Sequence, residues 1–317
     1  EMSSPAVTAL AKPATDPLGY AFAVGGAILF SSKSILIKLA YAQGAPTETL
    51  LALRMLVALP VYLVILATIL RRNPELRSRL TMANVLPAMA TGILGYYISS
   101  YLDFEALNFI TAQYGRLVLF TYPFFVVLFG ALFFKEKFDW HIVPGMIVAY
   151  GGIVLLFGWS LVAEPEGLLR GTLLVLTAAV TFAFYQLFAK GRMRTLGTGL
   201  FTCIGMSTAA LCAIGQSAVI GGADAFVHLP AMVWVYGLGL GVFATVLPSF
   251  LMNAAIARIG ARANSSTAAF GPIVTIAFAV VFLSEPFTIF HALGTALVIL
   301  GSVMFSHAER QARKRQV

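Results

Sequence analysis

Ten long apolar runs divide this chain, and they limit what it can fold into more than any other feature of the sequence. They lie at 18–40, 48–70, 81–102, 106–134, 141–161, 168–189, 198–220, 230–252, 264–283 and 288–307. About twenty helical residues cross the roughly 30 Å hydrocarbon layer of a bilayer. Backbone polar groups in lipid require helices or a closed barrel, and barrel strands are about half as long. The runs therefore predict an all-α integral membrane protein with ten transmembrane helices.

The composition agrees with lipid as the main solvent. Of the 317 residues only 11% are charged and 59% are hydrophobic, whereas a soluble domain carries about 25% charged residues. The net charge of +8 comes from basic residues scattered between the apolar runs. They form no continuous basic face, so we expect no nucleic-acid partner. Cys203 and Cys212 match no metal or redox motif.

The basic residues lie on alternate connecting segments. One set of segments carries sixteen of the 21 Lys and Arg residues: Lys12, Arg71, Arg72, Arg77, Arg79, Lys135, Lys137, Lys190, Arg192, Arg194, Arg258, Arg262, Arg310, Arg313, Lys314 and Arg315. The other set carries Lys38 and Arg170 with most of the acids, among them Asp103 and Glu105. Positive segments stay cytoplasmic. We therefore expect a multi-pass protein of the inner (plasma) membrane with cytoplasmic tails at 1–17 and 308–317.

An internal repeat is the strongest pattern in the sequence. A shift of 149 residues aligns 92–152 with 241–301 without a gap. The identical pairs include Gly92/Gly241, Ser100/Ser249, Ala106/Ala255, Pro123/Pro272, Glu136/Glu285, Phe138/Phe287, Gly145/Gly294 and Gly152/Gly301. A shift of 152 also pairs Gly19 with Gly171 and Lys38 with Lys190. The repeating unit is therefore about 150 residues long and contains five apolar runs.

An odd number of helices in the unit fixes the relation between the two copies. The second copy must enter the membrane from the opposite side, so repeats at 18–161 and 162–307 are inverted relative to each other. Secondary transporters use inverted repeats to build an inward and an outward gate around a midplane site. We predict two inverted five-helix repeats around a central cavity, in a monomer because the duplication supplies both halves.

Two stretches resemble a known family. The segments FFKEKFDWHIVPGMIVAYGGIVLLFG at 133–158 and FLSEPFTIFHALGTALVILGSVMF at 282–305 are similar to the Glu-containing loop and Gly-rich helix of drug/metabolite transporters of the EamA type. The resemblance extends over 18–307 through helix count and duplication. It implies export of small metabolites, and the aromatic amino acid exporters are the group it most resembles.

Three cations lie inside apolar runs, where charges normally face a cavity or a partner. Lys33 either extends its amine to the outer headgroups or faces a cavity. Arg54, near Glu48, favours a structural or headgroup-directed role. Arg116 is harder to place at a membrane surface, and its guanidinium is a candidate for pairing with a substrate carboxylate.

Aromatic and amide side chains supply further candidates for a substrate cavity. Tyr97 and Tyr101 share a helix face, and Tyr114 is two residues from Arg116. Such residues also form interfacial belts in membrane proteins. In the second half the candidates are Tyr185, Gln186 and Asn253, which are polar groups that need partners in a membrane.

The repeat also marks candidate structural residues. Pro123 and Pro272 each remove a helix hydrogen bond at equivalent depths, which favours either hinges or simple kinks. The pairs Gly145/Gly152 and Gly294/Gly301 recur at seven-residue spacing, which puts each pair on one helix face and allows close helix contact. We expect the two helices that carry them to be packing elements at the periphery. Glu136 and Glu285 belong to the repeated loop motif.

No pattern in the sequence indicates a catalytic residue, a metal site or a cofactor. No motif places a base beside a nucleophile, and a receptor would not need the duplication. We therefore expect a secondary transporter of small amphipathic metabolites, with amino acids including aromatic ones favoured. A multidrug or hydrophobic-cation exporter is the alternative, and an intramembrane enzyme or receptor is more remote. No acid is expected at mid-span, so substrate would move uncoupled or by exchange, with any proton coupling at Asp103 or Glu105.

Overall fold

The computed structural model of the chain describes residues 16–135, 138–163, 166–222, 226–252, 254–255, 258–259 and 270–314. Within those ranges the ordered elements are helices. They are α1 (Pro17–Ser31), α2 (Lys33–Tyr41), α3 (Thr47–Arg72), η1 (Pro74–Arg79), α4 (Met82–Gly92), η2 (Ile93–Ile98), α5 (Ser99–Ala106), α6 (Ala112–Leu119), α7 (Tyr122–Phe134), η3 (Trp140–Ile142), α8 (Val143–Ala163), α9 (Leu168–Leu196), α10 (Thr198–Gly221), α11 (Ala231–Gly241), η4 (Val242–Val246), α13 (Phe270–Leu283) and α14 (Ile289–Lys314).

The helices form the predicted set of membrane spans. Among the described residues, eight stretches are long and apolar enough to cross a bilayer: Pro17–Tyr41, Thr47–Arg72, Ala112–Phe134, Trp140–Val162, Leu168–Leu196, Thr198–Gly221, Ala231–Met252 and Ile289–Glu309. The third span is the continuous series α4, η2 and α5, and the ninth contains the shorter apolar helix Gly271–Leu283. The prediction of an all-α membrane protein with ten helical spans is therefore confirmed.

Two spans of the first half are interrupted. The first span breaks at Ser32 between α1 and α2, where Ser32 Oγ donates to the carbonyl of Leu29. The fourth span breaks between α6 and α7, directly before Pro123. Proline has no N–H to continue the helical ladder, so the chain makes a tight turn in which Phe124 N–H bonds to the Thr121 carbonyl. The expected interruption at Pro123 is therefore present.

A π-helical turn recurs in both halves. It occupies Ile93–Ile98 in the third span and Val242–Val246 in the eighth. The shift of 149 residues that aligns the two halves places one turn on the other. Such turns insert one extra residue into an α-helix and often mark functional sites. The duplication has thus kept a backbone irregularity as well as side chains.

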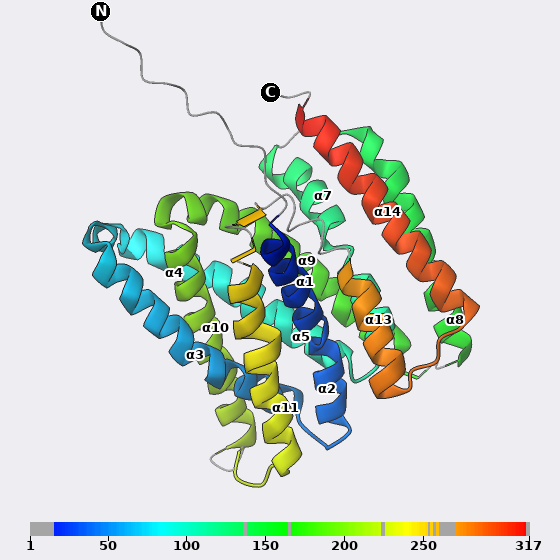
Figure 1. Cartoon of the computed structure of the whole chain (residues 1–317), viewed down its shortest axis with the longest axis horizontal. Helices are drawn as coiled ribbons and strands as arrows, with labels where there is room; N and C mark the ends of the chain where they lie inside the picture. The colour runs from blue at the N-terminus through cyan, green and yellow to red at the C-terminus, as the bar shows by residue number, and fades with distance from the viewer. Residues whose placement is uncertain are drawn as a thin grey trace, which may run out of the picture.

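The inner helices of each half pack against those of the other half. The third span packs on α9 and α10 of the second half, while α11 of the eighth span packs on α2 and α3 of the first half. Helices α3 and α10, which occupy equivalent places in the two repeats, also contact each other closely. Figure 1 shows α3, α10 and α11 together on one side of the molecule. Each half therefore covers the inner surface of the other.

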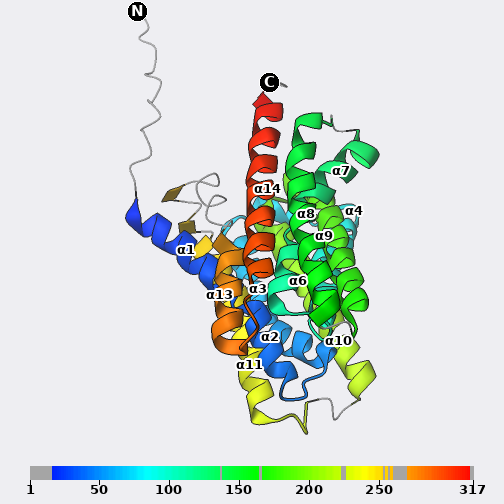
Figure 2. The same cartoon turned by 90° about the vertical axis from the view of Figure 1, so that its right-hand side faces the viewer.

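Helices α8 and α14 form a separate antiparallel pair at one edge of the molecule (Figures 1 and 2). A Cβ atom on Gly152 would lie 2.6 Å from the Gly294 carbonyl oxygen. One on Gly145 would lie 2.7 Å from that of Gly301. Gly145 of α8 thus lies against Gly301 of α14, and Gly152 lies against Gly294, so the two helices are antiparallel. These glycines therefore lie where the two helices meet, a pairing that the sequence did not specify.

Contacts between segments that are distant in the sequence show which connecting segments lie on the same face of the molecule. Arg79 Nη1 donates to the Thr195 carbonyl at 3.3 Å, which joins the segment after α3 to the end of α9. Arg258 pairs with Asp16, the N-cap of α1, at 3.1 Å. The hydrogen bond from Arg258 holds the pKa of the Asp16 carboxyl below its usual value. In Figure 2 the end of α14 points toward the same side as the start of α1.

The opposite face is held by acidic residues. Glu105 Oε2 accepts hydrogen bonds from Thr47 and Asn108. Glu285 accepts from the backbone N–H groups of Ala112 at 2.7 Å and Gln113 at 3.2 Å. The Glu285 carboxylate therefore satisfies the free N–H groups at the start of α6. This contact joins the repeated loop motif of the second half to the first half.

Candidate functional site

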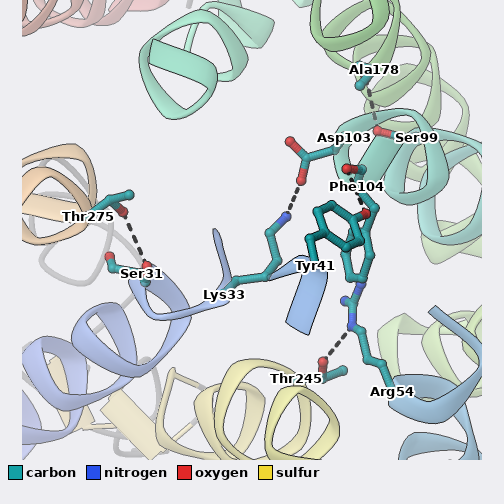
Figure 3. Close-up of polar contacts among 10 residues, drawn as sticks. All are labelled: Ser31, Lys33, Tyr41, Arg54, Ser99, Asp103, Phe104, Ala178, Thr245 and Thr275. Carbon is teal, nitrogen blue, oxygen red and sulfur yellow. Dashed lines mark hydrogen bonds and ion pairs between the residues drawn. The ribbon is translucent and has the colours of Figure 1, made fainter. Parts of the chain in front are cut away.

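A buried ion pair lies where the interrupted first span meets the third. Lys33 is the first residue of α2, and its Nζ lies 2.5 Å from Oδ2 of Asp103 in α5. Each residue keeps only 6% of its accessible surface. Figure 3 shows the two side chains pointing toward each other from opposite helices. Isolated charges are too costly at this depth, so each one requires the other.

This arrangement corrects one expectation. Lys33 does not extend to the headgroups, because its amine is buried against Asp103. The sequence placed Asp103 near the outer edge, and the residue lies in the last turn of α5, which continues the third span to Ala106. Its carboxylate is nevertheless buried, because the helix turns this side chain inward.

Arg54 of α3 is a third charged side chain near the ion pair, and it interacts electrostatically with Asp103. It is 8% exposed, and its Nε donates to Thr245 Oγ1 at 2.7 Å. Thr245 belongs to the π-helical turn η4 of the second half. The guanidinium also lies 5.6 Å from the Phe104 ring centroid. These contacts are visible in Figure 3, and they exclude a headgroup-directed role for Arg54.

Arg116 occupies the last turns of α6, just before the interruption of the fourth span. Its guanidinium lies 5.1 Å from the centroid of the Phe30 ring, and Lys33 Nζ lies 5.8 Å from the same centroid. A Cβ atom on Gly271 of α13 would stand 3.1 Å from Arg116 Nη2. The aromatic ring of the first span is therefore shared by two cations from different helices.

Hydrogen bonds from side chains to backbone carbonyls hold the interrupted segments together around this point. Ser31 Oγ donates to the Gly271 carbonyl at 3.1 Å. Thr275 Oγ1 donates to the Ser31 carbonyl at 3.3 Å (Figure 3). The break in the first span is thus tied to the start of α13. Pro272 lies in this first turn of α13, one residue after Gly271. The two repeats meet at the site through these bonds.

Cations outnumber acids in this group. The charged neighbours of Lys33 include Asp103, which attracts it, and Arg54 and Arg116, which repel it. Asp103 also attracts both arginines. Arg54 Nη1 and Arg116 Nε are buried and have no hydrogen-bond acceptor among the described residues. We call Phe30, Lys33, Arg54, Asp103 and Arg116 the cation site.

The first-half tyrosines predicted for the cavity do not join the cation site. Tyr97 and Tyr101 do share a face, but that face packs on α10 in the largest apolar cluster. Tyr101 faces Gln216. Tyr114 is 2% exposed, and its hydroxyl accepts from Thr172 of α9. Residues two apart on a helix point in widely different directions, so nearness in sequence to Arg116 did not bring Tyr114 to the same surface.

The predicted residues of the second half are also dispersed. Tyr185 lies in α9, buried against Tyr96 of η2, and their hydroxyl oxygens are 2.5 Å apart. Gln186 is half-buried on the same helix. Asn253 and Glu136 lie outside the described residues. None of the described residues among these four is a member of the cation site.

Phe30 and Asp103 were not among the cavity residues predicted from the sequence, nor was Thr245, which accepts a hydrogen bond from Arg54. Phe30 lacked a signal because aromatic residues are common in every span. Asp103 had one: it is the first acid to follow the third apolar run, and Lys33 in the first half needed a partner. Thr245 had another, because it falls in a segment aligned with the first-half π-helical turn. No group of three His, Cys, Asp or Glu side chains among the described residues is placed to hold a metal ion.

Comparisons with known proteins point to one class. The EamA-like transporter family matches residues 17–158 and again residues 169–307. The transporter YcbK of Bacillus subtilis is 28% identical over 300 residues, covering 93% of each chain. A transporter of Clostridium kluyveri is 24% identical over 300 residues, covering 93% of this chain and 94% of its own.

A solved crystal structure of another protein shares the fold. The alignment covers 93% of this chain and 98% of the other, with a TM-score of 0.58. The two sequences are 19% identical, so this likeness concerns the fold alone.

Proposed function

Because the chain belongs to the EamA-like transporter family, we propose that it is a secondary transporter that exports small amphipathic metabolites by alternating access. Amino acids, including aromatic ones, are the favoured substrates. The relatives described above are named only as transporters, so the substrate class rests on the cation site.

The shared Phe30 ring is the observation that carries this proposal. Arg116 and Lys33 lie over it at 5.1 Å and 5.8 Å from its centroid, and Arg116 Nε has no acceptor in the described part of the chain. A substrate carboxylate can take the free guanidinium N–H groups, while its apolar or aromatic part stacks on the ring. An amphipathic metabolite with a carboxylate matches both features.

The fold supports alternating access. The helices that carry the cation site come from interrupted spans or contact a π-helical turn, and such irregular backbone is tolerated in membranes where it lines a pathway. The two halves exchange helices with inverted symmetry, so one rocking motion can close one face while it opens the other. Pro123 and Pro272 remain our candidates for its hinges. We propose that a single copy suffices, since both halves are in one chain.

Orientation follows from the two faces. The face with Arg79, Thr195 and Arg258 also carries most of the Lys and Arg in the connections. We therefore propose, from the positive-inside rule, that this face is cytoplasmic and that both termini lie on it, in the inner membrane.

An exporter of hydrophobic cations is the alternative within the same fold. The cation site disfavours it, because Lys33, Arg54 and Arg116 would repel a positively charged substrate. A catalytic or receptor role remains the remote alternative, and the family favours neither.

Counterflow in proteoliposomes tests the proposal. Vesicles loaded with unlabelled L-phenylalanine should accumulate external labelled L-phenylalanine, and empty vesicles should not. Arg116→Ala should raise the half-saturating concentration by about tenfold or more, because a charge-assisted hydrogen bond contributes about 1.5 to 3 kcal/mol. Arg170→Ala, at a side chain 66% exposed on the outer rim, is the matched control and should leave transport unchanged.

Two results would contradict the proposal. Equal counterflow by the Arg116→Ala protein would remove this residue from the site, and no counterflow of any amino acid would remove the substrate class.

We propose that transport is uncoupled or proceeds by exchange, so it should persist after the pH gradient is dissipated. Collapse of transport under that condition would instead indicate proton coupling, for which Asp103 is the buried candidate.

A further inference from the structure

We infer that the cation site selects substrates with a net negative charge, so that an organic anion binds more tightly than the zwitterion or the cation built on the same skeleton. The inference rests on the proposed transport function and narrows its substrate class. It follows from the balance of charges around Lys33.

The site contains more positive than negative charge. Lys33, Arg54 and Arg116 converge from α2, α3 and α6, whereas Asp103 of α5 is their common attractive partner. Glu105, the next acid along α5, is engaged at the outer rim by Thr47, Asn108 and Arg170. One carboxylate therefore faces three cations, and the four groups together keep a surplus of two positive charges.

The surplus is accompanied by unused hydrogen-bond donors. Asp103 already accepts from Lys33, and the Arg54 Nε donates to Thr245. Arg54 Nη1 and Arg116 Nε have no acceptor among the described residues. Arginine keeps its proton in proteins, so the guanidinium groups stay charged. A buried guanidinium without an anion is costly, so an incoming carboxylate relieves both the charge and the missing acceptors.

The net charge of the substrate then determines the order of binding affinity. A monoanion supplies two acceptor oxygens and removes half of the surplus. A zwitterion supplies the same carboxylate, but its ammonium restores the positive charge and must compete with Lys33 for Asp103. A cation supplies no acceptor and adds to the repulsion. The apolar part of all three can stack on Phe30 equally, so charge alone separates them.

Three compounds with one phenylethyl skeleton test this ranking. They are 3-phenylpropionate, L-phenylalanine and 2-phenylethylammonium, with net charges of about −1, 0 and +1 at neutral pH. Binding to the full-length protein in detergent is measured by the ligand-dependent shift of its melting temperature. We expect 3-phenylpropionate to bind about tenfold more tightly than L-phenylalanine, and 2-phenylethylammonium to bind most weakly. Equal or tighter binding of either amine, or no binding of the anion, would overturn the inference.

A variant pair assigns the preference to the surplus cations. Arg54→Gln and Arg116→Gln each remove one positive charge and keep hydrogen-bonding capacity, so each should reduce the preference for the anion over L-phenylalanine by about tenfold. Arg170→Gln, outside the site, should preserve it. If one of the two variants does not fold, the anion preference of the other variant and the ranking of the three compounds still test the inference. An unchanged preference in a folded variant contradicts the inference.

Counterflow of each labelled compound separates this inference from the proposed function. If none of the three compounds is transported while the anion still binds most tightly, the transport proposal fails and the charge selectivity stands. If the amines are transported and bound as well as the anion, transport stands and the charge selectivity fails.

Discussion

The Lys33 ammonium and the Asp103 carboxylate lie 2.5 Å apart although 70 positions separate them in the chain. Both are buried, and each is the other's direct hydrogen-bonding partner. This pair fixes the interrupted first span against the third. It also provides the clearest test of the site's architecture.

Removing one partner of the pair should destabilise the protein strongly. Asp103→Asn leaves the Lys33 ammonium buried without its anion, and breaking a buried pair in this way costs about 3–5 kcal/mol. Lys33→Met should have a similar effect. The double variant Lys33→Met/Asp103→Asn should be less destabilised than the sum of the two. Unfolding in detergent measures the three free energies, and an additive result would contradict a direct pair.

The glycine contact between α8 and α14 should tolerate no side chain. Gly152→Val would place a Cβ atom 2.6 Å from the Gly294 carbonyl oxygen, so we expect a loss of about 1–3 kcal/mol from overpacking. Gly151→Val is the matched control, because a Cβ there has no neighbour within 4 Å. Thermal unfolding of the two purified proteins checks the difference. Equal melting temperatures would show that the helices do not meet at Gly152.

The Glu285 carboxylate should stabilise the start of α6. Glu285→Ala leaves the N–H groups of Ala112 and Gln113 without an acceptor, which should cost about 1–2 kcal/mol. Glu285→Gln keeps one acceptor oxygen and should lose less. Glu75→Ala, on the exposed turn η1, should have no effect on stability. Should the alanine variant at 285 melt like the unaltered protein, the cap would contribute nothing.

The two faces can be checked by labelling introduced cysteines in spheroplasts. Cys203 and Cys212 are first replaced by Ser. A membrane-impermeant maleimide added outside should label Gln43→Cys, whereas Ser78→Cys and Arg194→Cys should be labelled only after the cells are opened. Positions 78 and 194 lie beside the Arg79–Thr195 contact. Labelling of 78 and 194 from opposite sides would refute the inverted arrangement.

The sequence predicted the fold well because its signals act over whole spans. Apolar runs define the helices, and the duplicated glycines mark two helix faces suited to close packing, although not that α8 and α14 pack on each other. The interruption at Pro123 was also predictable, since proline lacks the N–H that a helix needs. These features depend on local physics repeated along the chain.

The site was harder to predict because it depends on side-chain direction between distant spans. Tyr114 is two residues from Arg116 and yet points into the core against Thr172. Asp103 lies near the end of its span, as expected, but its burial against Lys33 depends on how the first and third spans pack. Arg54 finds Thr245 only through the packing of the two halves. Such pairings are long-range, and no local pattern encodes them.

The packing of each half on the helices of the other has a consequence for how the protein folds during synthesis. Helix α8 ends the first repeat, but the helix it packs against, α14, is synthesised only after the other helices of the second repeat. The largest apolar cluster likewise combines residues such as Leu53 with Met206 and Val233. The first five spans thus enter the bilayer with their inner surfaces uncovered and complete their packing only after the second repeat has been synthesised. Two half-length polypeptides synthesised together should therefore assemble with each other, and neither should persist when produced by itself.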